Sequence, residues 1–140
     1  MDIETIKRLE YVTLQSDLDL MTFGEKFQKA LMLPQMDYDY ENETEWLDID
    51  HDGINYNVSR PYEEGTLQEW DDTTPEGCNF GIVLGIHKDH PHVLDDTWVD
   101  STVAIVCRQL AETFQTTVYH HRTFTSGIDI SESKNIAFAP

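Results

Sequence analysis

The sequence predicts an α+β fold, in which one antiparallel or mixed sheet packs against two main helices and residues 1–140 form a single domain. Two segments repeat apolar residues at helical spacing, and several others alternate polar and apolar residues as strands do. No internal repeat and no low-complexity linker divides the chain. A length of 140 residues, with 39% hydrophobic and 11% aromatic residues, suits one folded domain.

The N-terminal part contains an ambiguous segment and then a helix. Apolar residues within 3–9 suit a helix, whereas residues 11–14 suit a strand, so both structures stay open for this segment. Thr22 and Glu25 form a capping-box pattern, in which each side chain accepts a hydrogen bond from a backbone N–H at a helix start. A helix is therefore expected over residues 23–33, ending before a proline.

The middle of the chain predicts a hairpin followed by a long loop. Residues 46–50 and 54–58 both alternate polar and apolar side chains. Asp52 and Gly53 lie between them and tolerate the positive φ angles of a tight turn. Residues 60–77 are polar and contain prolines and glycines, which predicts a loop.

The C-terminal half predicts two strands around a second helix. The strands are expected over residues 78–86 and 117–124, and the helix is expected to begin after Thr97, with Asp100 near its positive N-terminus. The tail from Ser126 is predicted to be partly irregular, with Ile128, Ile130 and Phe138 able to fold back. The helix face expected to pack on the sheet consists of Val99, Val103, Val106, Leu110 and Phe114.

The charge of the chain is concentrated in one stretch. The net charge is −18 and the isoelectric point is about 4.3. Residues 37–76 alone hold fourteen acids and one base, Arg60. Such a charge repels nucleic-acid phosphates and anionic membranes, so we expect no direct binding to either.

The location predicted for the chain is the cytoplasm. No apolar run approaches the roughly 20 residues of a membrane span, and the first four residues lack the basic and apolar regions of a signal peptide. Cys78 and Cys107 have apolar neighbours and no CxxC spacing, which predicts buried thiols in a reducing compartment.

Acidic residues alternate with other residues over 37–45, in what we name the acidic ladder. In one extended strand all of its carboxylates would project from the same face, about 6.6 Å apart. After Trp46 the alternation changes phase, which predicts a bend or bulge near residues 45–47. The ladder consists of Asp37, Asp39, Glu41, Glu43 and Glu45.

Two interpretations of the ladder remain open. It could be a solvated edge strand whose charges prevent aggregation. We favour a docking strip for a basic protein, because Tyr and Trp rings are interleaved with the acids, and such rings are common in interface hot spots. The residues expected to contact that partner are Asp37, Asp39, Tyr40, Glu41, Glu43, Glu45, Trp46, Asp48, Asp50, Glu63, Glu64 and Trp70.

Two patterns suggest metal sites, and we interpret neither as one. Residues 48–54 match the opening of a calcium-binding EF-hand loop, but Ser59 occupies the position that needs a bidentate glutamate. His87, His90 and His92 are clustered, but their spacing matches no helical or finger-type zinc motif, so a surface loop is favoured.

No catalytic motif is present in the sequence. The chain has no nucleophile elbow, no phosphate-binding P-loop and no dinucleotide-binding glycine pattern. Cys107 lies within the second predicted helix, where a structural thiol is favoured over a nucleophile. We therefore expect no enzymatic activity and no cofactor.

As a whole-chain profile, the sequence resembles the immunity proteins of bacterial polymorphic toxin and contact-dependent inhibition systems. The resemblance rests on the size, the charge, the acidic strip at residues 37–52 with Tyr38, Tyr40 and Trp46, and the lack of catalytic motifs. It implies a cytoplasmic α+β protein that neutralises a cognate toxin domain, often a basic nuclease, by occluding its substrate-binding surface.

Three alternatives stay open beside this resemblance. The same charge suits a nucleic-acid mimic that inhibits a DNA-binding protein. The loop with His87, His90 and His92 could serve a small metal-dependent enzyme. An adaptor or assembly subunit is the third alternative.

Overall fold

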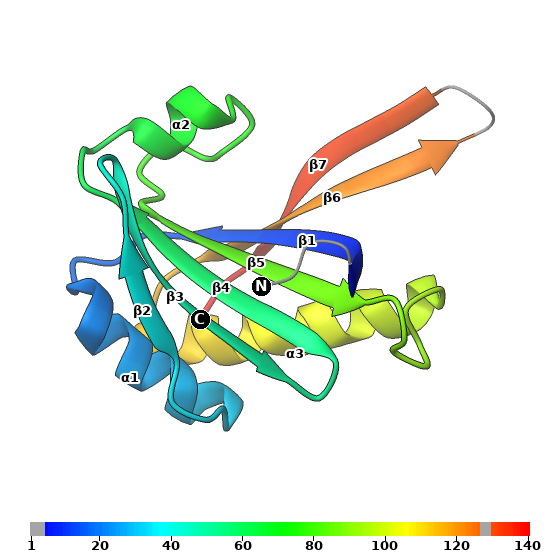
Figure 1. Cartoon of the computed structure of the whole chain (residues 1–140). Helices are drawn as coiled ribbons and strands as arrows, with labels where there is room; N and C mark the ends of the chain where they lie inside the picture. The colour runs from blue at the N-terminus through cyan, green and yellow to red at the C-terminus, as the bar shows by residue number, and fades with distance from the viewer. Residues whose placement is uncertain (1–4, 127–129) are drawn as a thin grey trace.

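The computed structural model describes residues 5–126 and 130–140, except for the side chains of residues 123–132. One antiparallel sheet has the strand order β2-β3-β4-β5-β1-β6-β7 (Figure 1). This arrangement confirms the predicted α+β class. The strands are β1 (Ile6–Leu14), β2 (Asp37–Tyr40), β3 (Thr44–His51), β4 (Ile54–Pro61), β5 (Phe80–His87), β6 (Val118–Ser126) and β7 (Ile130–Phe138), and the helices are α1 (Leu20–Leu31), α2 (Thr66–Trp70) and α3 (Asp96–Phe114).

The two long helices lie on the same side of the sheet, whereas the short helix α2 lies on the other side, near one end (Figure 1). We name the side covered by α1 and α3 the helix face and the opposite side the open face. Residues that are paired directly across neighbouring strands point to the same face, so the register determines which side chains share a face.

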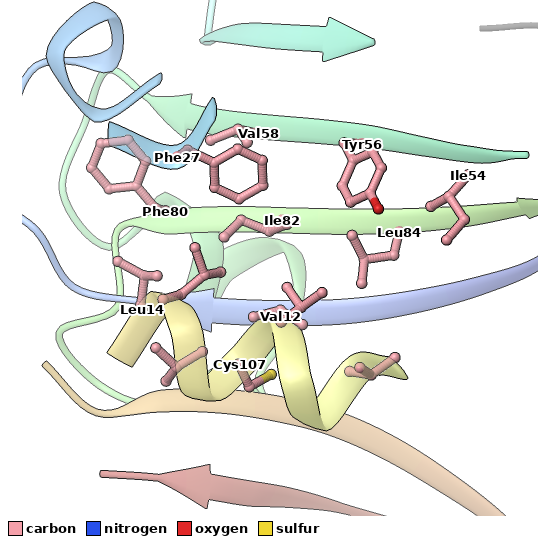
Figure 2. Packing of buried hydrophobic residues seen from close by; sticks show 14 of the residues in the cluster. Val12, Leu14, Phe27, Ile54, Tyr56, Val58, Phe80, Ile82, Leu84 and Cys107 are labelled. Atoms are coloured by element: carbon pink, nitrogen blue, oxygen red, sulfur yellow. The ribbon is translucent and has the colours of Figure 1, made fainter. Parts of the chain in front are cut away.

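The core lies between the helix face and the two long helices. Figure 2 shows side chains from the central strands, among them Val12, Val58 and Ile82, gathered with Phe27 of α1 and Cys107 of α3. These five side chains are buried, and the register pairs Val12 and Val58 with Ile82. Both predicted amphipathic helices therefore bury their apolar faces on the sheet, as expected.

Three aromatic rings stack at the centre of this core. The ring centroid of Phe23 lies 4.1 Å from that of Phe80 on β5 and 4.2 Å from that of Phe114 on α3. Phe23 and Phe80 are fully buried. This stack joins α1, α3 and the sheet, so it ties the two layers together.

The starting points predicted for both helices are wrong, although the helices themselves are confirmed. In α1 the cap is Asp19, whose carboxylate accepts the Thr22 N–H at 2.8 Å, so Thr22 lies inside the first turn. In α3 the cap is Asp95, whose carboxylate accepts the Trp98 N–H at 3.0 Å. Asp100, which was expected near the helix N-terminus, is the fifth residue of α3, and its carboxylate forms a bidentate ion pair with the guanidinium of Arg122 on β6.

The ambiguous N-terminal segment forms a strand, and the predicted hairpin is confirmed. β1 is central in the sheet because it pairs with both β5 and β6. In the hairpin, β3 and β4 are joined by Asp52 and Gly53, with φ angles of 51° and 77°. Two consecutive positive φ angles are what a type I′ hairpin turn requires.

Two regions that were predicted to be irregular are more ordered. The loop over 60–77 contains α2, which is held by the buried side chain of Leu67 and by Gln68, whose amide donates to the carbonyls of Pro75 and Cys78. The C-terminal tail contains β7, which pairs with β6 along its length. Ile128 lies outside the described residues.

Both cysteines are buried and unpaired, as predicted. Burial raises the pKa of the Cys107 thiol to about 12 and also raises that of Cys78. Among the described helices, none is long and apolar enough to span a bilayer.

Candidate protein-binding surface

The acidic ladder does not form one strand, and the expectation that its five carboxylates share one face is wrong. The chain reverses at residues 41–43, where the N–H of Glu41 donates to the carbonyl of Thr44 at 2.8 Å. β2 then pairs with β3. The register of β3 continues without interruption through residues 45–47, so the reversal, and not the predicted bulge, accounts for the phase change.

The register nevertheless brings five of the predicted contact residues to one face. Leu47 is buried against α1, so its neighbours along β3 point to the open face. These neighbours are Trp46 and Asp48, and Asp50 follows two positions later. β2 adds two acids, because Asp37 lies opposite Asp48 and Asp39 lies opposite Trp46. We name this set the acidic cluster; its members are Asp37, Asp39, Trp46, Asp48 and Asp50.

Two predicted contact residues, Tyr40 and Glu45, lie opposite each other on the other side of the sheet. Tyr38 shares this side and donates its hydroxyl to Glu45 at 3.0 Å, while the Tyr38 and Tyr40 ring centroids are 6.1 Å apart. Partial burial and the Glu45 carboxylate raise the pKa of Tyr38 to about 12. The structure therefore does not place Tyr40 and Glu45 with the acidic cluster.

The remaining predicted residues line two hollows at the end of the sheet. Glu41 and Glu43, in the β2–β3 turn, border a cavity of about 520 Å³ whose far wall is Trp70 of α2. Glu63 and Glu64 border a second cavity, of about 480 Å³, beside α2. α2, which the sequence did not predict, is thus the element that brings Trp70 next to the turn.

Two polar residues that the sequence did not assign to this surface, Asn55 and His87, hold the β3 carboxylates in place. The side-chain amide of Asn55 on β4 donates to Asp48 at 2.8 Å and to Asp50 at 2.9 Å, and Asn55 is only 1% exposed. Nε2 of His87 lies 3.2 Å from the Asp50 carboxylate. The alternation over residues 54–58 contained the signal, because it places Asn55 on the polar side of its strand.

These contacts set the charge state of Asp50. Partial burial acts to raise its pKa, but the hydrogen bonds from Asn55 and His87 outweigh burial and lower the pKa below the usual value of 3.8. Asp50 is therefore a fixed negative charge at neutral pH. A carboxylate held in one orientation loses less side-chain entropy when it binds a cation.

The open face also carries apolar side chains that the sequence analysis did not single out. Leu9 and Tyr11 of β1 are 43% and 47% exposed, and Val83 of β5 lies next to Tyr11 in the register. The N-terminal segment was ambiguous in sequence, so its exposed face could not be assigned.

The histidine loop packs as a small aromatic group. The rings of His90 and His92 lie 4.5 and 5.2 Å from the ring of Trp98, whereas His87 turns toward Asp50. Across residues 5–126 and 130–140, no group of three or more His, Cys, Asp or Glu that could hold a metal ion is found. Residues 48–54, which resemble an EF-hand opening, form the β3–β4 hairpin.

Comparisons with protein-family models, with curated proteins and with solved structures find no match to this chain.

Proposed function

We propose that this protein binds and neutralises a basic toxin domain, in the manner of the immunity proteins that its sequence resembles. One observation carries the proposal: four carboxylates from two strands share with Trp46 a sheet face that neither long helix covers. An acidic surface of this kind attracts a positively charged partner and accelerates its association.

The position of the acids argues against a merely solvated edge. Edge protection explains Asp37 and Asp39, because β2 is the terminal strand of the sheet. It does not explain Asp48, because β3 is paired there with β2 on one side and with β4 on the other; Asp50 lies beyond the last residue paired with β2. Asn55 also orients those two carboxylates, and a face that needed only to be soluble would not need such support.

Neutralisation would occur by occlusion. A nuclease or other basic toxin domain binds its anionic substrate through Lys and Arg side chains, and the acidic cluster offers carboxylates to the same groups. Exposed ion pairs contribute little in water, so the ring of Trp46 and that of Trp70 would strengthen them by excluding solvent.

The proposal is tested by growth rescue in a bacterial host. The toxin domain encoded by the neighbouring gene is induced with and without this protein, and the two purified proteins are then mixed at increasing salt concentrations. We expect rescue and a complex that weakens as salt increases. A neighbour that kills equally well in the presence of this protein would overturn the proposal.

A matched pair of variants separates the acidic cluster from general charge. In the test variant Asp37 and Asp39 become Asn, and in the control Glu25→Gln and Glu112→Gln are combined. All four acids are exposed, and each variant removes two negative charges. We expect the association rate of the test variant to fall about tenfold or more at low salt, while the control changes much less.

A further inference from the structure

We infer that the docking surface extends from the acidic cluster across the open face to the exposed apolar side chains of β1 and the partly exposed Val83 of β5. The partner would then be a basic protein whose cationic side chains flank an apolar contact. This inference rests on the proposed function and adds to it a second half of the interface, made by Leu9, Tyr11 and Val83. We name these three residues the apolar patch.

The register places the two halves in one continuous row. Across the open face Asp48 is paired with Asn57, Asn57 with Val83, and Val83 with Tyr11. Strands are spaced about 4.8 Å apart, so Tyr11 lies about 14 Å from Asp48 along this row. A protein interface of ordinary size covers about 800 Å² per partner, which is roughly 28 Å across, so one partner can cover both halves.

The apolar patch is not part of the core. The long helices cover the other face. Among the described residues, α2 covers the open face near Gly81, where a Cβ atom would lie 3.6 Å from Leu67, and the loop after α2 reaches β7, where the side-chain amide of Asn135 donates to the carbonyl of Thr73 at 2.8 Å. Leu9 and Tyr11 nevertheless stay 43% and 47% exposed. A solvated face of an antiparallel sheet carries polar side chains at its outward positions. Leu9 and Tyr11, at successive outward positions of a central strand, depart from that pattern.

Charge complementarity identifies the occupant. A second copy of the chain would bring a net charge of −18 against another −18, with the acidic cluster close to the contact. A basic domain removes that repulsion, because its cations meet the acids while its apolar atoms meet Leu9 and Tyr11. Tyrosine is also enriched among the residues that contribute most to binding at interfaces.

The two halves should affect different rate constants. Exposed charges at a distance mainly change the association rate and its salt dependence. Apolar contacts form only in the docked complex, so they mainly change the dissociation rate. The apolar patch therefore predicts a kinetic effect that the acidic cluster does not share.

The test uses the purified toxin domain of the rescue experiment as the probe, with association and dissociation followed at several salt concentrations. The test variant combines Leu9→Thr and Tyr11→Thr, since β-branched residues suit a strand. The control combines Met21→Gln and Ile105→Gln, which remove apolar side chains of similar exposure, 52% and 54%, from α1 and α3. We expect dissociation of the test variant to accelerate about 50-fold or more with an unchanged salt slope, while the control stays close to wild type.

Hydroxyl-radical footprinting of the wild-type protein tests the same surface without any substitution. Leu9 and Tyr11 should become protected when the probe is added, and Met21 and Ile105 should not. Unchanged dissociation together with unprotected Leu9 and Tyr11 would overturn this inference while leaving the proposed function intact. A probe that does not bind wild-type protein would overturn both. A dimer in sedimentation that the Leu9→Thr and Tyr11→Thr variant abolishes would show that a second copy is the occupant, and would also overturn the inference.

Discussion

Replacing Asp37 by Asn should make the folded protein more stable while weakening its binding. The β2–β3 register sets Asp37 directly opposite Asp48, so two negative charges face each other across the pair of strands. Like charges in that position destabilise a sheet. The charge of Asp37 therefore opposes folding, which suits a residue that serves binding and not stability. Asp37→Asn tests this interpretation directly.

The size of the effect follows from the spacing. Side chains at opposite positions place their charged groups about 6 Å apart, and at that distance two unit charges in water repel each other by about 0.7 kcal/mol. Screening lowers this to about 0.4 kcal/mol at 0.1 M salt and about 0.1 kcal/mol at 1 M salt. The expected stabilisation by Asp37→Asn is therefore small at physiological salt and disappears at high salt.

Urea unfolding at pH 7 measures this difference, because urea is uncharged and the salt concentration can be varied independently. Glu112→Gln on α3 is the matched control, since it removes one exposed negative charge far along the chain from the acidic cluster. A stabilisation that persists at 1 M salt, or one that the control reproduces in full, would refute the assignment to the Asp37–Asp48 repulsion.

Three further predictions concern the core and the titrating groups. Gly24→Ala should destabilise the protein by about 1–3 kcal/mol in urea unfolding, although alanine favours helices, because the new Cβ would lie 2.2 Å from Cδ1 of Leu47. In the double variant Gly24→Ala, Leu47→Ala, the loss of unfolding free energy should be smaller than the sum of the two single losses. Asp50→Asn should destabilise the protein at pH 5. Because folding lowers the pKa of Asp50, its ionised carboxylate contributes fully to the free energy of unfolding above the usual value of 3.8, and this contribution is lost as the pH falls through the pKa of the folded state. Acid titration of the wild-type protein and of Asp50→Asn should therefore show that the difference between their unfolding free energies shrinks below pH 3.8. Cys107, whose pKa is raised to about 12 by burial, should react with a disulfide reagent at pH 8 only after urea is added, and a fast reaction in the folded protein would contradict that burial.

The core could be predicted from sequence because its signals are local and periodic. The spacing in residues 99–114 and the alternation in residues 78–86 both identified the buried side correctly. The helix starts could not be located as well, because several capping residues compete within one turn. Asp19 precedes Thr22 and Asp95 precedes Thr97, and only the path of the preceding chain decides which carboxylate reaches the free N–H groups.

Sequence patterns identified the residues of the candidate surface but not their arrangement in space. Alternation shows which residues share a face only while the strand continues. Asp52 and Gly53 mark the β3–β4 turn strongly, whereas the acidic ladder contains no equally strong turn signal at residues 41–43, where the chain reverses. The pairing of β2 with β3 and the central place of β1 are non-local. Sequence patterns therefore could not place Tyr11 and the acidic cluster on one face.

Under the proposed function, the helix face of the sheet provides stability and the open face provides recognition. The stacked rings around Phe23 and the apolar row from Val12 to Leu47 lie on the helix face, so the free energy of folding comes mainly from that side. The open face carries opposed carboxylates and exposed apolar side chains, and both features are unfavourable in an isolated protein. A partner of positive charge with an apolar contact relieves both at once, because cations neutralise the facing acids and the contact covers Leu9 and Tyr11. Substitutions of Asp37, Leu9 or Tyr11 should accordingly leave the unfolding free energy unchanged or raised, whereas each of them should weaken binding.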